Sequence, residues 1–338
     1  MSEIKERLFS WSNKKLKSSG KLAMTAIYPL RQEASTREYF RLNNKKESLI
    51  GVFSPPEREL NEQFIFLSKF FKKRGITVPE VLFFDLKNGL MLIEDFGDDS
   101  YQFRLNENNF HDLFSSAIDE MICIQGCPIN SKIPTLGSNE LKNQMVLFEE
   151  WFLEGFLELK LRKKEKDLFS KLYEGVLHDL QKQPKVLCHF DFESRNLMIL
   201  RNGNTGVLDF QDATYGPIFL DPVSLFKDLY LEITEADEVF LLKEYLERSK
   251  ELRLGHSLEI ASSIRSFDLT GLQRQLRILG TLSRLHLRDG KSFRLKDLNK
   301  TLKFVIETCN KYEEFNEVSN FLDKEVIPLL NLALKRTI

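Results

Sequence analysis

Short apolar runs separated by turn-forming residues mark the first hundred positions of the chain. Five segments have this pattern: residues 23–28, 39–42, 49–53, 81–84 and 90–93. Runs of this length, rich in aliphatic and aromatic residues, are typical of strands. The sequence therefore predicts five strands, with a turn at Asn43-Asn44-Lys45-Lys46 between the second and the third.

Residues 57–74 have helical rather than alternating spacing, and they follow the strand-breaking Pro55-Pro56. Their apolar side chains share one side of a helix: Leu60, Phe64, Leu67, Phe70 and Phe71. Gly75 is expected to end this helix. The predicted layout, a five-stranded sheet with one inserted helix, is that of the N-terminal lobe of a protein kinase.

After residue 98 the pattern is almost entirely helical. The expected helices are residues 107–126, 139–159, 164–182, 221–250 and, with breaks, 257–335. Residues 1–22 are predicted to form an amphipathic helix in which apolar residues alternate with lysines. We therefore expect three parts: this helix (1–22), an N-lobe (23–97) that ends in a hinge, and a helical C-lobe (98–338).

Composition and charge exclude several classes of function. Hydrophobic residues make up 42% of the chain, and its 49 basic and 50 acidic residues nearly cancel. We expect no binding to nucleic acid or membrane and no obligate protein partner. The four cysteines lack the spacing of a zinc site, and the N-terminus lacks the features of a signal peptide. The sequence therefore predicts a cytoplasmic protein.

The strongest candidate for chemistry is the segment from His189 to Asn196, which has the form H-x-D-x-x-x-x-N. It lies between the short apolar runs 186–188 and 197–200, and Asp209 follows a third run at 206–208. In kinase-like phosphotransferases such a loop and a second aspartate surround one transferring phosphate. We expect the loop and the end of the third strand to meet at one point.

Each polar group of this pattern has a predicted role. Asp191 is the candidate general base that accepts the proton of the attacking hydroxyl, and Asn196 with Asp209 would hold magnesium. His189 is expected to support the loop. Asp221 is predicted to cap the next helix, after a turn at residues 215–217.

Other polar residues near this segment leave alternatives open. Arg195 could pair with an acid or bind phosphate, and Asp212 could be a metal ligand, a substrate contact or a turn acid. Gln211 and Lys227 are further candidates for substrate contacts. Downstream, Arg274, Arg277, Arg284 and Arg288 share one helix face, which could attract an anionic substrate or be solvated. Arg274 and its neighbour Gln273 are the substrate-binding candidates there.

The sequence evidence for a nucleotide-binding site is weaker than that for the catalytic loop. Ser35 and Arg37 lie in the turn where kinases fold a loop over the phosphates, but no glycine-rich phosphate-binding motif is present. The third strand, Ser48 to Phe53, contains no lysine. Arg37, Arg41 or Lys46 could replace it. Nucleotide recognition at the hinge is expected around the segment Glu94, Asp95 and Phe96.

Five segments together resemble the aminoglycoside phosphotransferase/choline kinase superfamily, and more narrowly its anomeric sugar kinases of cell-wall recycling. They are residues 33–41, 92–98, 189–196, 206–217 and 271–291. The resemblance spans about residues 23–305. It implies an α+β, bilobal, protein-kinase-like fold with a small β-rich N-lobe and a large, mainly helical C-lobe.

The resemblance also implies chemistry. It implies ATP and Mg²⁺ as cofactors, Asp191 as base, Asn196 and Asp209 as metal ligands, and Ser35 and Arg37 at the phosphates. Family members commonly lack the strand lysine. This chain departs at Glu38 and Lys227, where relatives tend to have arginine.

The implied activity is phosphorylation of N-acetylmuramate and/or N-acetylglucosamine at the C1 hydroxyl, so the expected partner is a small amino sugar. One alternative is phosphorylation of another alcohol, such as an aminoglycoside, choline or homoserine. The missing strand lysine motivates a second alternative, a nucleotide-binding pseudokinase. Magnesium-dependent turnover of ATP with a sugar would separate these alternatives.

Overall fold

The computed structural model describes residues 2–30, 36–251 and 260–337. The chain forms two compact units. Unit 1 comprises residues 1–124 and 195–212, and unit 2 comprises residues 125–194 and 213–338. This division differs from the expected lobes 23–97 and 98–338, which stay a prediction. The boundary follows Ser194, so Asp191 belongs to unit 2, whereas Asn196 and Asp209 belong to unit 1.

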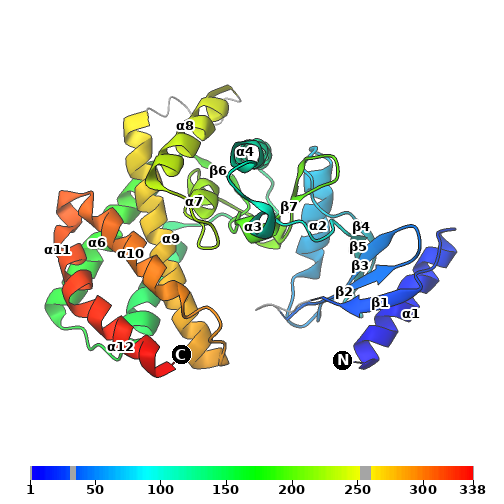
Figure 1. The fold of residues 1–338 in the computed structure, drawn as a ribbon, viewed down its shortest axis with the longest axis horizontal. Coiled ribbons are helices and arrows are strands. Elements are labelled where there is room, and N and C mark those ends of the chain that lie inside the picture. The colour runs from blue at the N-terminus through cyan, green and yellow to red at the C-terminus, as the bar shows by residue number, and fades with distance from the viewer. Residues whose placement is uncertain (1, 31–35, 252–259, 338) are drawn as a thin grey trace. The chain divides into compact units, whose positions relative to one another are not determined.

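Unit 1 contains the predicted five-stranded sheet (Figure 1). The strands are β1 (Ala26–Pro29), β2 (Glu38–Asn43), β3 (Ser48–Phe53), β4 (Val81–Asp85) and β5 (Leu90–Glu94). They are antiparallel in the order β1-β2-β3-β5-β4. The β2–β3 turn is closed by Asn44, whose side chain accepts hydrogen bonds from the amides of Lys46 and Glu47. Asparagine favours turns because it bonds to the backbone in this way.

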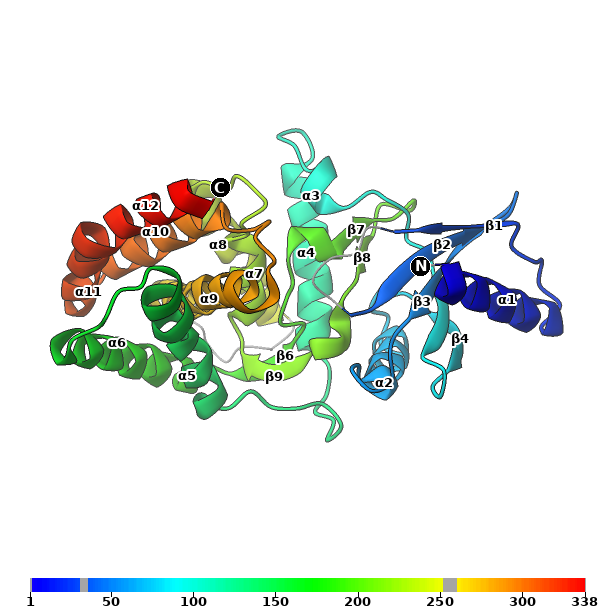
Figure 2. The same ribbon diagram turned by 90° about the horizontal axis from the view of Figure 1, so that it is seen from below.

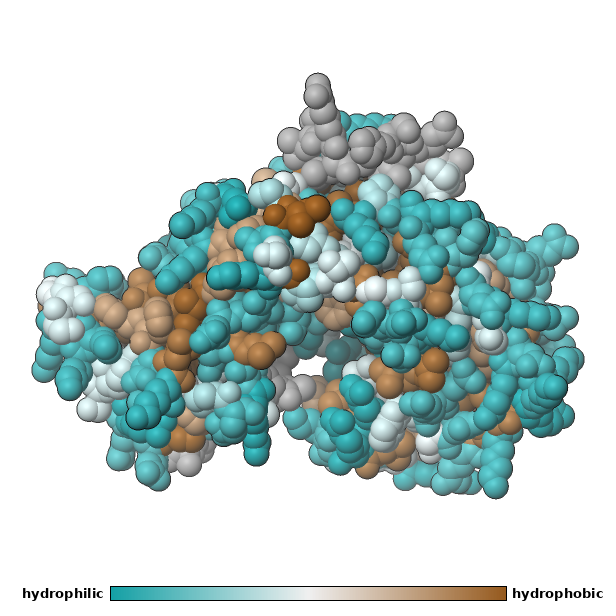
Figure 3. Space-filling view, turned by 180° about the vertical axis from the view of Figure 1, so that it is seen from behind, coloured by the Kyte–Doolittle hydropathy of each residue, from teal (hydrophilic) through white to brown (hydrophobic). Residues whose placement is uncertain are grey.

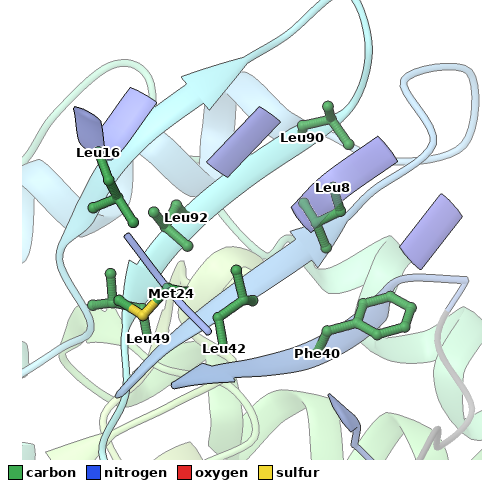
Figure 4. Close-up of a cluster of buried hydrophobic side chains, with 8 residues drawn as sticks. All are labelled: Leu8, Leu16, Met24, Phe40, Leu42, Leu49, Leu90 and Leu92. Atoms are coloured by element: carbon green, nitrogen blue, oxygen red, sulfur yellow. The ribbon is translucent and has the colours of Figure 1, made fainter. Parts of the chain in front are cut away.

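Helix α1 (Ser2–Ser18) covers one face of the sheet. Figure 4 shows the resulting core, in which Leu8 and Leu16 of α1 meet side chains of the strands and Met24. Gly51 of β3 allows this close packing, because a Cβ there would lie 2.9 Å from Leu8. The amphipathic pattern of the N-terminal segment is therefore explained by burial against the sheet.

Unit 1 also contains three helices and a short β-hairpin. Helix α2 (Asn61–Lys72) begins later than the predicted residue 57, because residues 56–59 form a turn. It is followed along the chain by α3 (Tyr101–Arg104) and α4 (Phe110–Gln125). The hairpin of β7 (Leu197–Ile199) and β8 (Thr205–Val207) pairs Leu197 with Val207.

Unit 2 is mainly helical. It contains α5 (Ser138–Leu147), which continues as the π-helical segment Phe148–Phe156, then α6 (Lys163–Lys182), α7 (Leu220–Phe226), α8 (Glu235–Glu251), α9 (Ile260–Asp289), α10 (Asp297–Asn310), α11 (Asn316–Phe321) and α12 (Ile327–Thr337). Helix α9 is central and packs against α5, α6, α7 and α10 (Figure 2). Gly280 permits the contact with α5, because a Cβ there would lie 2.3 Å from the Leu147 carbonyl carbon.

The small sheet of unit 2 corrects one prediction. Residues 215–217 were expected to form a tight turn, but Thr214–Pro217 is strand β9, paired antiparallel with β6 (Lys185–Cys188). Gly216 lies opposite Val186, and Pro217, which has no N–H to donate, is the last residue of the strand. The loop that carries Asp191 leaves the end of β6.

The described residues contain no helix long and apolar enough to cross a membrane. Hydrophilic side chains cover most of the face drawn in Figure 3, where hydrophobic groups are interspersed among them. The four cysteines, all among the described residues, form no disulfide.

Candidate active site

A pocket of about 370 Å³ lies within unit 1. Its wall is formed by side chains from β2, β3 and β5, the segments next to these strands, α2 and both ends of the β7–β8 hairpin. The polar and charged residues among them are Arg37, Tyr39, Arg41, Glu94, Asp95, Arg195, Asn196 and Asp209. Pockets of this size with a few polar groups among apolar side chains are typical of small-molecule sites.

Asn196 and Asp209 lie together because the β7–β8 hairpin fixes both. Asn196 directly precedes β7, Asp209 follows β8 by two residues, and the Leu208 amide donates a 2.8 Å hydrogen bond to the Asn196 carbonyl. Both residues line the pocket. Asp209 has a positive φ of 61°, which is uncommon for an L-residue. The backbone therefore adopts an unusual conformation at a candidate metal ligand.

The chemistry of these two residues fits magnesium. Mg²⁺ prefers oxygen ligands and is usually held by one or two carboxylates together with substrate phosphates and water. Asp209 supplies a carboxylate, whose Oδ1 accepts a 2.6 Å hydrogen bond from Gln211, and Asn196 supplies an amide oxygen. Within residues 2–30, 36–251 and 260–337, no group of three or more His, Cys, Asp or Glu could hold a metal alone.

Arg37 enters the pocket from the start of β2. Its guanidinium pairs with Glu59 at 3.0 Å, donates to the Ser54 hydroxyl at 3.1 Å and lies 5.5 Å from the Phe64 ring centroid. Next to it, burial raises the pKa of the Tyr39 phenol to about 12, with Arg37 acting to lower it and Asp209 to raise it. Arg37 and Asp209 are thus both close enough to Tyr39 to influence its pKa. The other candidate in this loop, Ser35, lies outside the described residues.

The segment after β5 closes another side of the pocket. Arg41 donates to Asp95 at 3.1 Å and to Asp98 at 2.8 Å. Glu94 accepts hydrogen bonds from Lys72 and from the Glu80 amide, so its side chain is held at the end of β5. The Phe96 ring packs on Gly206, where a Cβ would come within 2.7 Å of it. Glu94, Asp95 and Phe96 all line the pocket, and their contact with a nucleotide stays a prediction.

In unit 2, buried acids hold the loop of Asp191 through its backbone. The Asp221 carboxylate accepts hydrogen bonds from the amides of His189 and Phe190, at 2.7 and 2.9 Å. The Asp228 carboxylate accepts one from the Ser194 amide at 2.6 Å. Burial raises the pKa of both carboxyls, and these amide hydrogen bonds act in the opposite direction. The prediction that Asp221 caps a helix was wrong, because its side chain binds the loop instead.

Asp191 itself is held by two arginines of α9. Its Oδ1 lies 3.0 Å from Arg277 Nη2 and 3.4 Å from Arg274 Nη1. Arg274 also pairs with Glu193, and Arg277 lies over the Phe190 ring at 4.4 Å from its centroid. Burial lowers the pKa of the Arg277 guanidinium, and the Asp191 carboxylate acts in the opposite direction. These two arginines therefore contact acids of the loop, whereas Arg288 on the same helix is exposed and pairs with Asp289.

The other residues that were predicted to contact the substrate differ in their surroundings. Lys227 is buried and pairs with Glu238 at 2.5 Å and with Asp268 at 3.7 Å, which favours a structural role. Gln273 is buried and donates to Gln144 of α5 at 2.9 Å. Asp212 is exposed, Gln211 is half-buried and bound to Asp209, and Arg195 lines the pocket of unit 1.

Comparison with known proteins places the chain in a family. A sequence profile of the phosphotransferase enzyme family matches residues 141–254. An N-acetylmuramate/N-acetylglucosamine kinase from Neisseria meningitidis is 30% identical over 304 residues, which cover 86% of this chain and 90% of the relative. The chain belongs to the N-acetylmuramate/N-acetylglucosamine kinase family. A member from Pseudomonas aeruginosa is 29% identical over 303 residues, covering 90% of this chain and 89% of that relative.

Solved structures show that the family fold is bilobal and kinase-like. Choline kinase LicA from Streptococcus pneumoniae has a TM-score of 0.63 at 14% identity, covering 90% of this chain and 99% of that chain. The ADP-bound aminoglycoside phosphotransferase APH(2'')-Ib has a TM-score of 0.62 at 16% identity, with 89% and 98% covered. At these identities the likeness establishes the fold and leaves the acceptor open.

Glu59 was not predicted as a site residue, and Asp228, considered together with Lys227 as a weaker substrate contact, was not predicted to hold a loop. Glu59 pairs with Arg37, and Asp221 and Asp228 hold the loop of Asp191. Arg277 was noted only as one member of a charged helix face. None of the four belongs to a short motif, because their partners are distant in sequence. Only the fold brings them together.

Proposed function

We propose that the protein is an ATP-dependent kinase that transfers the γ-phosphate to the anomeric C1 hydroxyl of N-acetylmuramate and/or N-acetylglucosamine. One observation carries the proposal. This chain belongs to a sugar kinase family, and two of its oxygen donors, Asn196 and Asp209, both line a pocket of about 370 Å³. The proposal places the protein in the cytoplasm and in cell-wall recycling, and its four cysteines, which form no disulfide, agree with a reducing compartment.

The nucleotide and metal groups of the proposed reaction come from unit 1. Asn196 and Asp209 would hold Mg²⁺, which when bound neutralises charge on the phosphate oxygens. Arg37 would bind the phosphates of ATP, and the segment from Glu94 to Phe96 would contact its adenine ring. Phosphoryl transfer depends mainly on positioning and charge stabilisation, which groups held this firmly can supply.

The proposed base comes from unit 2. Asp191 would accept the proton of the C1 hydroxyl as the oxygen attacks the γ-phosphorus. Its loop is fixed through three backbone amides by Asp221 and Asp228, so the backbone at the base is well determined. Such support is what a general base needs, since small displacements reduce the rate strongly.

The balance of charged groups around Asp191 favours the binding of a neutral or anionic acceptor. The carboxylates of Asp191 and Glu193 are matched by the guanidinium groups of Arg274 and Arg277. A cationic acceptor such as choline or an aminoglycoside would be favoured by an excess of acidic groups, which this cluster lacks. Arg274 would meet the lactyl carboxylate of N-acetylmuramate.

An assay of ADP release with ATP and Mg²⁺ tests the proposal. It is run in parallel on N-acetylmuramate, N-acetylglucosamine, kanamycin and choline, and repeated with GTP as donor. We expect turnover on the amino sugars and a phosphate that is stable to alkali and labile to acid, as at an anomeric centre. Turnover on kanamycin or choline alone would contradict the proposed acceptor. ATP binding without turnover on any acceptor would favour a pseudokinase.

A further inference from the structure

We infer that Glu59 is a positioning residue that holds Arg37 as the phosphate-binding cation of the pocket in unit 1. Together the two residues would replace the lysine–glutamate pair of protein kinases, whose lysine lies on the third strand. This inference rests on the proposed function, because it requires a nucleotide in that pocket.

The third strand cannot supply the cation. Strand β3 has the sequence SLIGVF, and the side chain that it contributes to the pocket wall is Ile50. A nucleotide triphosphate carries several negative charges, which are usually matched by a basic side chain as well as by metal. The cation must therefore come from another element.

Three basic residues of the same sheet are candidates, and their surroundings separate them. Lys46 lies exposed in the β2–β3 turn and is not part of the pocket wall. Arg41 lines the pocket, but both of its terminal nitrogens bind acids after β5, at Asp95 and Asp98. Arg37 lines the pocket near Tyr39 and Asp209. Of the three, Arg37 fits phosphate binding beside the proposed metal ligands best.

Glu59 fixes the direction of the Arg37 side chain. Its Oε2 lies 3.0 Å from Arg37 Nη2, and its other oxygen accepts a hydrogen bond from the Thr36 hydroxyl. The side chain of Arg37 is 4% exposed and that of Glu59 17% exposed. A buried guanidinium requires an acidic or hydrogen-bonding partner, so removal of Glu59 would take away an acidic partner of the Arg37 charge.

Two further contacts connect this pair to Asp209. The Arg37 guanidinium lies over the Phe64 ring of α2, and the Phe64 ring stacks on Phe210 with centroids 4.9 Å apart. Phe210 directly follows Asp209. One aromatic side chain therefore contacts both the proposed phosphate cation and the neighbour of the proposed metal ligand.

A purely structural role for Glu59 predicts a different result from a positioning role. If Glu59 only stabilises the segment before α2, its loss lowers stability and weakens all ligands of the pocket alike. If it positions Arg37, its loss weakens ligands that carry β- and γ-phosphates and leaves adenosine almost unaffected. Binding can be measured without any sugar acceptor.

The experiment is calorimetric titration of the full-length protein with ATP, ADP and adenosine in the presence of Mg²⁺. We expect Glu59→Gln and Arg37→Gln each to weaken ATP binding about tenfold, as expected for loss of a charge-assisted hydrogen bond. Adenosine binding should change less than about twofold on this account, since adenosine carries no phosphate. Because the two residues act as one unit, the double variant should bind ATP no more weakly than Arg37→Gln alone.

Two matched variants make the result specific. Glu59→Asp keeps the charge and should retain more ATP affinity than Glu59→Gln, and Lys46→Gln, outside the pocket, should bind ATP like the unmodified protein. Thermal unfolding of each variant controls for folding. Equal weakening of ATP and adenosine by Glu59→Gln, or unchanged ATP binding, would overturn the inference. Failure of the unmodified protein to bind ATP would instead overturn the proposed function.

Discussion

Arg277 donates a 3.0 Å hydrogen bond to Asp191 Oδ1, the same carboxylate oxygen that Arg274 approaches at 3.4 Å. Both arginines lie on α9, the central helix of unit 2, which packs closely on α5 at Gly280. The position of the candidate base is therefore set by a helix more than eighty residues away in the sequence.

Arg277→Gln should lower kcat about tenfold, since a hydrogen bond to a charged group that orients Asp191 is lost. The KM for ATP should stay nearly constant. Arg277→Lys should recover part of the loss, because it restores the charge without the planar geometry. The control is Arg265→Gln, which removes an exposed arginine of the same helix that pairs with Glu314. An equal decrease of kcat in both variants would show that Arg277 does not act by orienting Asp191.

Asp191→Asn should reduce kcat by about 100-fold or more, the range measured for loss of a general base. Binding of ATP should be retained, because the pocket of unit 1 is unaltered. Steady-state kinetics and nucleotide titration together check this. Unchanged turnover would show that the base is another residue.

Asp209→Ala should abolish magnesium-dependent transfer while circular dichroism shows an intact fold. The carboxylate is one of two oxygen donors proposed for the metal, and its loss leaves only the amide of Asn196. Arg201→Ala, an exposed position in the same hairpin, serves as control. Full activity of Asp209→Ala across a magnesium titration would remove Asp209 from the site.

The sheet of unit 1 and most helices were predictable because the apolar residues of each element follow a clear strand-like or helical spacing, which ends at a turn-forming residue. Strand β9 was not, since Gly216 and Pro217 favour a turn locally and only pairing with β6 makes the segment extended. The proximity of Asn196 and Asp209 could be predicted, because a hairpin joins them. The division between units after Ser194 had no sequence signal, so the expectation that Asp191 meets these two residues stays a prediction.

Arg274→Ala should raise the KM for N-acetylmuramate more than the KM for N-acetylglucosamine, because only the former carries a lactyl carboxylate. Arg274 also pairs with Glu193, so both KM values are expected to change and their ratio is the test. Arg288→Ala, on the exposed part of the same helix, should leave the ratio unchanged. A ratio that Arg274→Ala does not alter would exclude a contact with the carboxylate.

Phosphorylation at C1 can be tested with an acceptor that differs from N-acetylglucosamine only at this position. The rate of ADP release with ATP and Mg²⁺ is measured on N-acetylglucosamine and on its 1-O-methyl glycoside, in which every other hydroxyl is kept. Phosphorylation at the anomeric hydroxyl predicts turnover of the free sugar and none of the glycoside. Comparable turnover of the two would contradict the account, since it would place the phosphate on another hydroxyl.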